Sequence, residues 1–276
     1  MIPPHAAPLA LLLAFVAGVH VALVLFAPRL RLLKPNFLHK PVLASYGIVS
    51  FAYIAAITAA LMINGLVETS RAALYLGMMA AMCALGLLDD VFGTREVGGF
   101  RGHFKKLIFE RRLTTGAIKA IGGGAVGIIT GWIVSNGDPA RWTAAALVIP
   151  LAANFLNLVD LRPGRAVAVF FVGLAVTCVL AGGRLPSPWI VGTIALVTLA
   201  WGIADSRGRA MMGDAGSNSL GAALGLTIAL STSLPAQIGA VLVLVAVNWY
   251  SEKRSISALI EGNRVLRAID SRLGVR

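Results

Sequence analysis

Two adjacent carboxylates, Asp89 and Asp90, close a long apolar stretch of the chain. Adjacent carboxylates repel each other, and the dipole of a helix makes acids unfavourable at its carboxyl end. A nearby cation removes both penalties, and Mg²⁺ binds carboxylate oxygens together with phosphate oxygens. The pair therefore indicates a site for a divalent cation and a phosphorylated ligand. The alternative is an acidic helix end without a ligand.

A second polar group consists of Asn154, Asn157 and Asp160. Their spacing of three residues places the side chains loosely along one face of a helix. Amides recognise sugars and bases through hydrogen bonds, and a carboxylate holds a metal or a hydroxyl, so this face predicts substrate binding. Buried asparagines that join neighbouring helices of a membrane bundle are the alternative.

A third group surrounds Asp214, within residues 212–218. Its small neighbours would let the backbone approach a ligand closely, and a helix that starts at Ala215 would favour an anion at its N-terminus. A polar turn with an acidic cap is the alternative.

A basic loop of residues 94–119 could bind phosphate or anionic lipid. Its basic side chains are Arg95, Arg101, His103, Lys105, Lys106, Arg111, Arg112 and Lys119.

The composition of the chain indicates which secondary-structure elements position these polar residues. The chain has 276 residues, of which 58% are hydrophobic and only 13% charged, whereas soluble domains carry about 25% charged residues. Helices of about 20 apolar residues that cross a bilayer account for the excess. We therefore predict an all-α, polytopic transmembrane bundle. The net charge of +12 follows from membrane topology, so no nucleic-acid partner is expected.

Nine spans are predicted from the windows that lack charged residues. Ser231 to Pro235 divide the last long apolar stretch into two spans. The predicted spans are residues 7–28, 43–63, 72–90, 118–135, 142–160, 166–182, 187–204, 216–231 and 235–250.

Basic residues set the orientation of the predicted spans. One set of alternate loops, together with the C-terminal tail, holds 21 of the 24 Lys and Arg residues, and the other set holds Arg71, Arg141 and Arg184. Basic loops stay in the cytoplasm. The N-terminus is therefore predicted to lie outside the cell and the C-terminus in the cytoplasm, with the spans in the inner or plasma membrane. All three acidic motifs then reach the cytoplasmic face.

Residues 1–250 form the predicted transmembrane domain, and residues 251–276 form a basic, amphipathic tail. Three arrangements of this tail are open: it lies on the membrane surface, it covers the site, or it pairs protomers.

The three motifs together resemble a known family. Leu-Asp-Asp at 88–90, Asn-x-x-Asn-x-x-Asp at 154–160 and Met-Gly-Asp-x-Gly-Ser at 212–217 are similar to the signature blocks of the polyprenyl-phosphate N-acetylhexosamine-1-phosphate transferases. That superfamily includes phospho-N-acetylmuramoyl-pentapeptide transferase. The resemblance covers about residues 34–220. It implies transfer of a sugar-1-phosphate from a UDP-sugar to polyprenyl phosphate, with release of UMP, in cell-envelope glycan synthesis.

The resemblance also implies roles for single residues. Asp89, Asp90 and Asp214 would be the catalytic and metal-binding residues, with Mg²⁺ as the metal and Mn²⁺ as an alternative. Asn157 and Asp160 would line the nucleotide-sugar pocket, and Lys119 would bind phosphate. The substrate-binding set predicted from the motifs and the resemblance is Asn154, Asn157, Asp160, Lys119, Arg162 and Arg165.

The chain departs from the family pattern in the number of its predicted spans, about nine where the family has ten, and in two of its motifs. Pro163 stands where many members have a second aspartate, and no histidine follows His103, although the family usually has a histidine cluster in its last cytoplasmic loop. Arg162 and Arg165 would supply the missing cationic contacts to a diphosphate. Two alternatives stay open: a paralogue that binds lipid phosphate without catalysis, and a lipid-linked transporter. A homodimer is compatible with the sequence.

Overall fold

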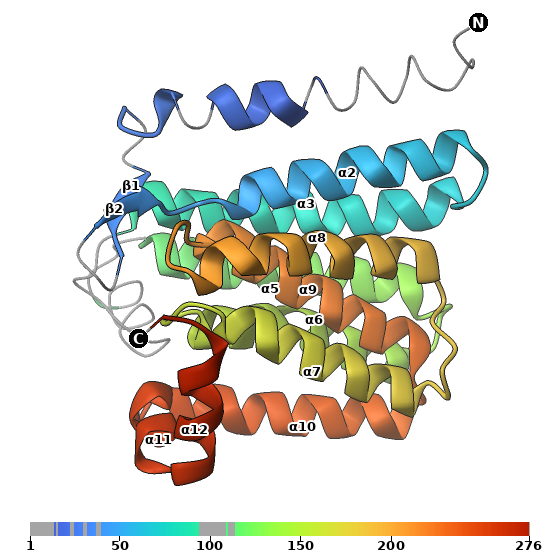
Figure 1. Cartoon of the computed structure of the whole chain (residues 1–276). Helices are drawn as coiled ribbons and strands as arrows, with labels where there is room; N and C mark the ends of the chain where they lie inside the picture. Colours follow the sequence, from blue (N-terminus) through green and yellow to red (C-terminus); the bar gives the residue numbers. More distant parts are fainter. Residues whose placement is uncertain are drawn as a thin grey trace, which may run out of the picture.

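The protein is a bundle of long helices (Figure 1). The computed structural model describes residues 40–93 and 114–275, together with residues 14, 16–22, 25–29, 32–36 and 109. The long helices are α2 (Gly47–Ile63), α3 (Thr69–Phe92), α5 (Thr115–Val134), α6 (Pro139–Val159), α7 (Arg165–Leu180), α8 (Pro188–Ser206), α9 (Gly213–Ser231) and α10 (Leu234–Ser251). Each lies on one of the predicted windows, and the break between Ser231 and Leu234 is confirmed. Much of the first window, 7–28, lies outside the described residues.

The bundle has the character of an α-helical membrane protein. Within the part of the chain that the structure describes, five helices are long and apolar enough to cross a bilayer: α3, α5, α6, α8 and α10. Helices α2 and α7 are apolar but shorter. Large apolar side chains point away from the bundle, as Trp132, Val179 and Leu242 do with 64%, 79% and 65% of their surface exposed. Such an outer surface is suited to lipid.

Helix α9 forms the centre of the bundle and packs mainly against α6 and α3. Its first half is rich in Gly, Ala and Ser, and these small residues let the neighbouring backbones come close. A Cβ atom added at Gly221 would lie 2.4 Å from the carbonyl oxygen of Ala152 on α6. Tyr75 of α3, fully buried, reaches Thr227 of α9 with an oxygen–oxygen distance of 3.1 Å. The polar start of α9 is thus held inside the protein rather than in lipid.

A short antiparallel hairpin precedes α2, and the sequence did not predict it. Strands β1 (Leu33–Pro35) and β2 (Pro41–Leu43) pair Leu33 with Leu43. Three-residue strands with prolines at their ends are too short to show the alternation of a sheet. The Met211 amide donates to the Leu43 carbonyl at 3.0 Å. The hairpin is thereby fixed to the loop that leads into α9.

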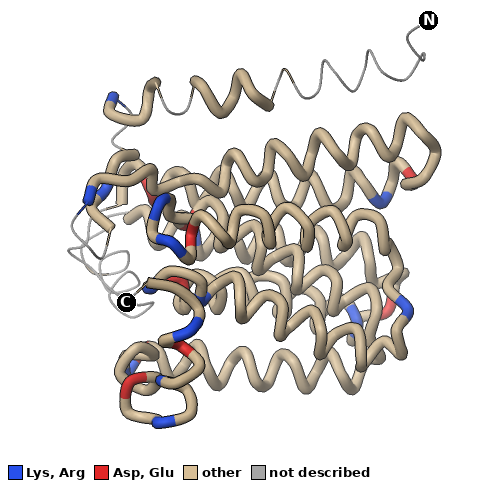
Figure 2. Tube along the Cα trace, in the orientation of Figure 1, with Lys and Arg blue, Asp and Glu red and all other residues tan. Residues whose placement is uncertain are grey.

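Charged residues gather at the two ends of the bundle (Figure 2). The larger group surrounds the hairpin and the C-terminus. Acids of all three motifs line one cavity there together with Lys34 of the hairpin: Asp89, Asp90, Asp160 and Asp214. At the opposite end, Glu68, Arg71, Asp138 and Arg141 border one depression. The predicted gathering of the motif acids at one end is therefore confirmed.

The tail folds into two short helices, α11 (Ile256–Gly262) and α12 (Arg264–Leu273). Both lie at the end of the bundle that carries the acidic motifs, and α12 runs across the axes of the long helices (Figure 1).

Candidate functional site

Four helices bring one charged or polar side chain each to a common point. The Lys119 Nζ atom of α5 lies 3.2 Å from Asp89 Oδ2 of α3 and 2.5 Å from Asp214 Oδ2 of α9. Asn157 of α6 donates from Nδ2 to the same Asp214 oxygen at 3.2 Å. Residues that are up to 125 positions apart in the chain thus form one cluster. Of the predicted site residues, the structure brings together Asp89, Lys119, Asn157 and Asp214.

Asp90 has a different place from Asp89. Its Oδ1 accepts from the Asp214 amide at 3.1 Å, and its Oδ2 accepts from the Ala215 amide at 3.1 Å and the Ser45 hydroxyl at 2.8 Å. Adjacent residues on a helix point about 100° apart, so the two carboxylates cannot face one ligand equally. Asp90 is buried and caps the N-terminus of α9 from another helix. It therefore positions Asp214, and its carboxylate gains from the dipole of α9.

Lys34 completes this arrangement from the hairpin. Its Nζ donates to the Asp90 carbonyl oxygen at 2.6 Å. The contact fixes the hairpin against α3 and places one more cation beside the carboxylates.

A cavity of about 800 Å³ opens beside the cluster. Ligand pockets of about 300–1,000 Å³ suit molecules of small to medium size. The charged residues on its wall are Lys34, Asp89, Asp90, Asp160, Arg162, Asp205 and Asp214. Both signs of charge are present, which suits a ligand that carries phosphates and hydroxyls and is accompanied by a cation.

Asp160 caps the C-terminus of α6, just beyond the end of that span. Its removal from water raises the pKa of its carboxyl well above the usual range, and the nearby Asp205, Asp214 and Asp90 carboxylates raise it further. Asp205, at the end of α8, accepts a hydrogen bond from the Gly164 amide at 2.7 Å. The loop from Asp160 to Gly164 is thus tied to α8 at the mouth of the cavity.

The raised pKa of Asp160 predicts a pH-dependent stability. The folded protein binds the Asp160 proton more tightly than the unfolded chain, so its stability falls as the pH rises from the usual Asp pKa of about 4 towards the raised value. We expect Asp160→Asn to raise the melting temperature at pH 7 and to leave it unchanged at pH 4. Melting curves of both proteins between these pH values measure this. Equal melting temperatures at pH 7 would contradict the prediction.

A divalent cation fits the cluster in part. Among the described residues, no group of three or more His, Cys, Asp and Glu side chains is close enough to hold a metal. Asp89 and Asp214, however, turn one oxygen each towards the same Lys119 ammonium. Mg²⁺ is usually bound by one or two carboxylates, several waters and substrate phosphates. The donors therefore fit a Mg²⁺ ion shared between these two carboxylates and a phosphate, with Asp90 outside the ligand set.

Two predicted site residues form their hydrogen bonds with residues outside the cluster. Asn154 donates to Asn248 of α10 at 2.5 Å, which matches the alternative of a contact between helices. Arg165 is buried and binds Asp270 of α12 with two hydrogen bonds, of 2.6 and 2.9 Å. Its guanidinium is used to hold the tail and is absent from the cavity wall given above. Arg162 does lie on that wall.

The structure adds residues that sequence reasoning did not select. Lys34, Ser45 and Asp205 lie at the cavity or support it. Ser217, which belongs to the third motif, donates to Asn157 at 3.2 Å. Asp205 could have been selected from the sequence, since an acid at the end of a span is a candidate functional residue. Nothing in the sequence indicates Lys34 and Ser45, because only the unpredicted hairpin brings them to α3. His39, His103 and the six Lys and Arg residues of 95–112 lie outside the described residues.

No protein-family model matches the chain, and no curated protein matches it. A functional assignment therefore has to rest on the cluster, the cavity and the motifs.

Proposed function

We propose that the protein transfers a sugar-1-phosphate, of an N-acetylated amino sugar, from a UDP-sugar to polyprenyl phosphate. The single observation that carries this is the meeting of Asp89, Lys119, Asn157 and Asp214 from four helices beside a charged cavity of about 800 Å³. A cavity at the end of an apolar bundle lets a polar nucleotide enter from water while the lipid substrate stays in the bilayer. Nine spans, with the N-terminus outside and the cavity on the cytoplasmic face, complete the proposal.

The reaction is a displacement at phosphorus. An oxygen of the lipid phosphate attacks the β-phosphorus of the UDP-sugar, the bond from that phosphorus to the bridging oxygen breaks, and UMP leaves with the bridging oxygen. The product is a polyprenyl-pyrophosphoryl sugar. In such transfers the protein contributes mainly positioning and charge stabilisation.

The described residues divide these tasks. Lys119, between the two carboxylates, is placed to bind a phosphate oxygen and to neutralise charge that develops on it. Asn157 orients Asp214 and can exchange this contact for one to the sugar or base. Arg162 and Lys34 are placed at the cavity for the diphosphate. When bound at Asp89 and Asp214, Mg²⁺ would neutralise the diphosphate and stabilise the UMP leaving group.

The test is turnover with defined substrates. Purified protein is incubated with undecaprenyl phosphate, Mg²⁺ and each of a panel of UDP-sugars, and UMP release is measured. We expect one or a few UDP-sugars to give UMP and a lipid-linked sugar. An Asp89→Asn protein serves as the matched control, because it keeps the size of the side chain and removes one charge. UMP release no greater than that of the control, with every sugar, would reject the proposal.

A binding protein without catalysis is the second candidate. It is favoured by the Lys119 ammonium, which pairs with both carboxylates and can hold a phosphate without any bond being broken. The same experiment separates the two, since this candidate predicts Mg²⁺-dependent binding of polyprenyl phosphate with no UMP.

A further inference from the structure

Helix α12 is packed in an unusual way. Asp270 is its only buried residue, whereas its apolar side chains are exposed except for the half-buried Leu273. Val265, Ile269 and Leu266 have 67%, 53% and 40% of their surfaces exposed. A helix that packs on a water-soluble protein normally buries its apolar face. The apolar face of α12 is therefore available to another apolar medium.

The protein fixes α12 firmly despite this exposure. Arg165 binds Asp270 with two hydrogen bonds and also donates to Ser257 at 2.8 Å. After α12, the Val275 amide donates to the Ser206 carbonyl at 2.8 Å. Gly164 lies so close to α12 that an added Cβ atom would be 2.3 Å from the Leu273 carbonyl oxygen. The exposed face is thus held in one orientation.

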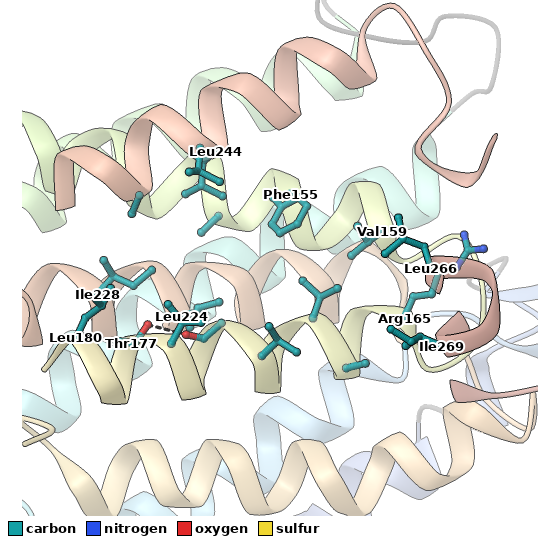
Figure 3. Close-up of a pocket in the computed structure, with 18 of the residues that line it drawn as sticks. Phe155, Val159, Arg165, Thr177, Leu180, Leu224, Ile228, Leu244, Leu266 and Ile269 are labelled. Carbon is teal, nitrogen blue, oxygen red and sulfur yellow. Dashed lines mark hydrogen bonds between the residues drawn. The ribbon is translucent and has the colours of Figure 1, made fainter. Parts of the chain in front are cut away.

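An apolar groove leads up to this face. It has a volume of about 790 Å³, runs between α7 and α10, and is floored by α6 and α9 (Figure 3). Leu266 and Ile269 of α12 line its end, beside Val159 and Arg165 (Figure 3). Leu180 and Thr177 lie towards the other end of the groove. The apolar side chains of α12 therefore continue a surface that belongs to the membrane-crossing part of the protein.

The rest of α12 is basic. Arg264, Arg267 and Arg272 are exposed, and Asp270, the one acid of the helix, is neutralised by Arg165. At the end of α10, Lys253 lies with its ammonium 3.8 Å from the centre of the exposed Trp249 ring. Exposed Trp beside Lys and Arg is typical of the level of lipid headgroups.

We propose that α12 is an in-plane membrane helix that binds anionic phospholipid. Its arginines hold the phosphate of the headgroup, and the acyl chains lie against Val265, Leu266 and Ile269 and enter the groove. Charge complementarity and the crossing direction of α12 favour this ligand over a second copy of the chain, whose tail carries the same positive charge. Basic residues next to an apolar helix face are the general requirement for such binding.

The experiment uses the full-length protein in detergent, with added dioleoyl phosphatidylglycerol or dioleoyl phosphatidylcholine, and native mass spectrometry to measure bound lipid. The wild-type protein is expected to prefer phosphatidylglycerol. The triple change Arg264→Gln, Arg267→Gln and Arg272→Gln is expected to weaken phosphatidylglycerol binding by about 100-fold, or about fivefold per arginine. Val265→Ser with Ile269→Ser is expected to weaken the binding of both lipids.

A matched control removes three charges elsewhere. Arg71→Gln, Arg141→Gln and Arg184→Gln act at the opposite end of the bundle and are expected to keep the preference. The proposal is overturned if the α12 triple variant keeps the preference, if the two lipids bind the wild-type protein equally, or if light scattering shows that α12 instead joins two copies. The assay contains no UDP-sugar, so its outcome is independent of turnover.

Discussion

Asp214→Asn is expected to reduce turnover by about 10³-fold, equivalent to about 4 kcal/mol, since a carboxylate that binds the metal and the Lys119 ammonium would be lost. The fold should survive this change. Lys119 keeps Asp89 at 3.2 Å, and asparagine keeps an oxygen that can accept from Asn157. We expect the melting temperature to stay within about 4 °C of the wild-type value, which corresponds to about 1 kcal/mol.

Asp90→Asn is the informative partner of this change. Its two oxygens accept three hydrogen bonds, from Ser45, Asp214 and Ala215, and an amide can serve these buried donors with only one oxygen. The loss should cost about 2 kcal/mol of stability and lower the melting temperature by about 4–8 °C. Activity should fall through displacement of Asp214.

Both variants are measured by UMP release and by thermal unfolding in the same detergent. The three aspartates are predicted to have two different roles. Asp89 and Asp214 take part in the chemistry by binding the metal, and Asp90 positions Asp214. If Asp90→Asn kept full stability and lost as much turnover as Asp214→Asn, Asp90 would belong with the metal-binding residues. If Asp214→Asn kept full turnover, the proposed site would be wrong.

Sequence reasoning predicted the helices and the gathering of the acids for a simple physical reason. Apolar windows of the length of a bilayer have few alternatives to a helix. Acids at span ends follow directly from those windows, so Asp89, Asp160 and Asp214 could be placed at one end before any contact was known. Asn157 followed from the helical period.

The contacts themselves could not be predicted in this way. Whether Asp90 faces a ligand or the start of α9 depends on how α3 and α9 are rotated about their axes. The apolar windows of the sequence give no information on this rotation. Arg165 has the same difficulty, because its partner Asp270 lies 105 residues later, in a tail whose position the sequence left open among three arrangements. Lys34 depends on a hairpin that has no periodic pattern. Side-chain direction was therefore the limit of sequence reasoning, while the position of a residue along its helix was accessible to it.

Gly86→Ala is expected to have the largest effect on stability, because Gly86 is the point where α3 meets the start of α9. A Cβ atom there would lie 2.2 Å from the Asp214 carbonyl oxygen and 2.5 Å from the Ala215 amide nitrogen. These are backbone atoms, which cannot rotate away as a side chain would. The two helices must separate, and the cost should be at least about 3 kcal/mol, at the upper end for overpacked cores.

The separation would also move Asp214 away from Lys119 and from the Asp90 carboxylate that caps α9, so activity should fall together with stability. A decrease of about 10 °C in melting temperature is expected. Gly77→Ala, on the same helix, is the matched control, because nothing lies within 4 Å of its added Cβ atom. There the change should be neutral or stabilising by up to about 1 kcal/mol, since alanine favours a helix over glycine. Equal melting temperatures for the two variants would show that α3 and α9 are not in close contact at Gly86, and the position of Asp214 would then have to be reconsidered.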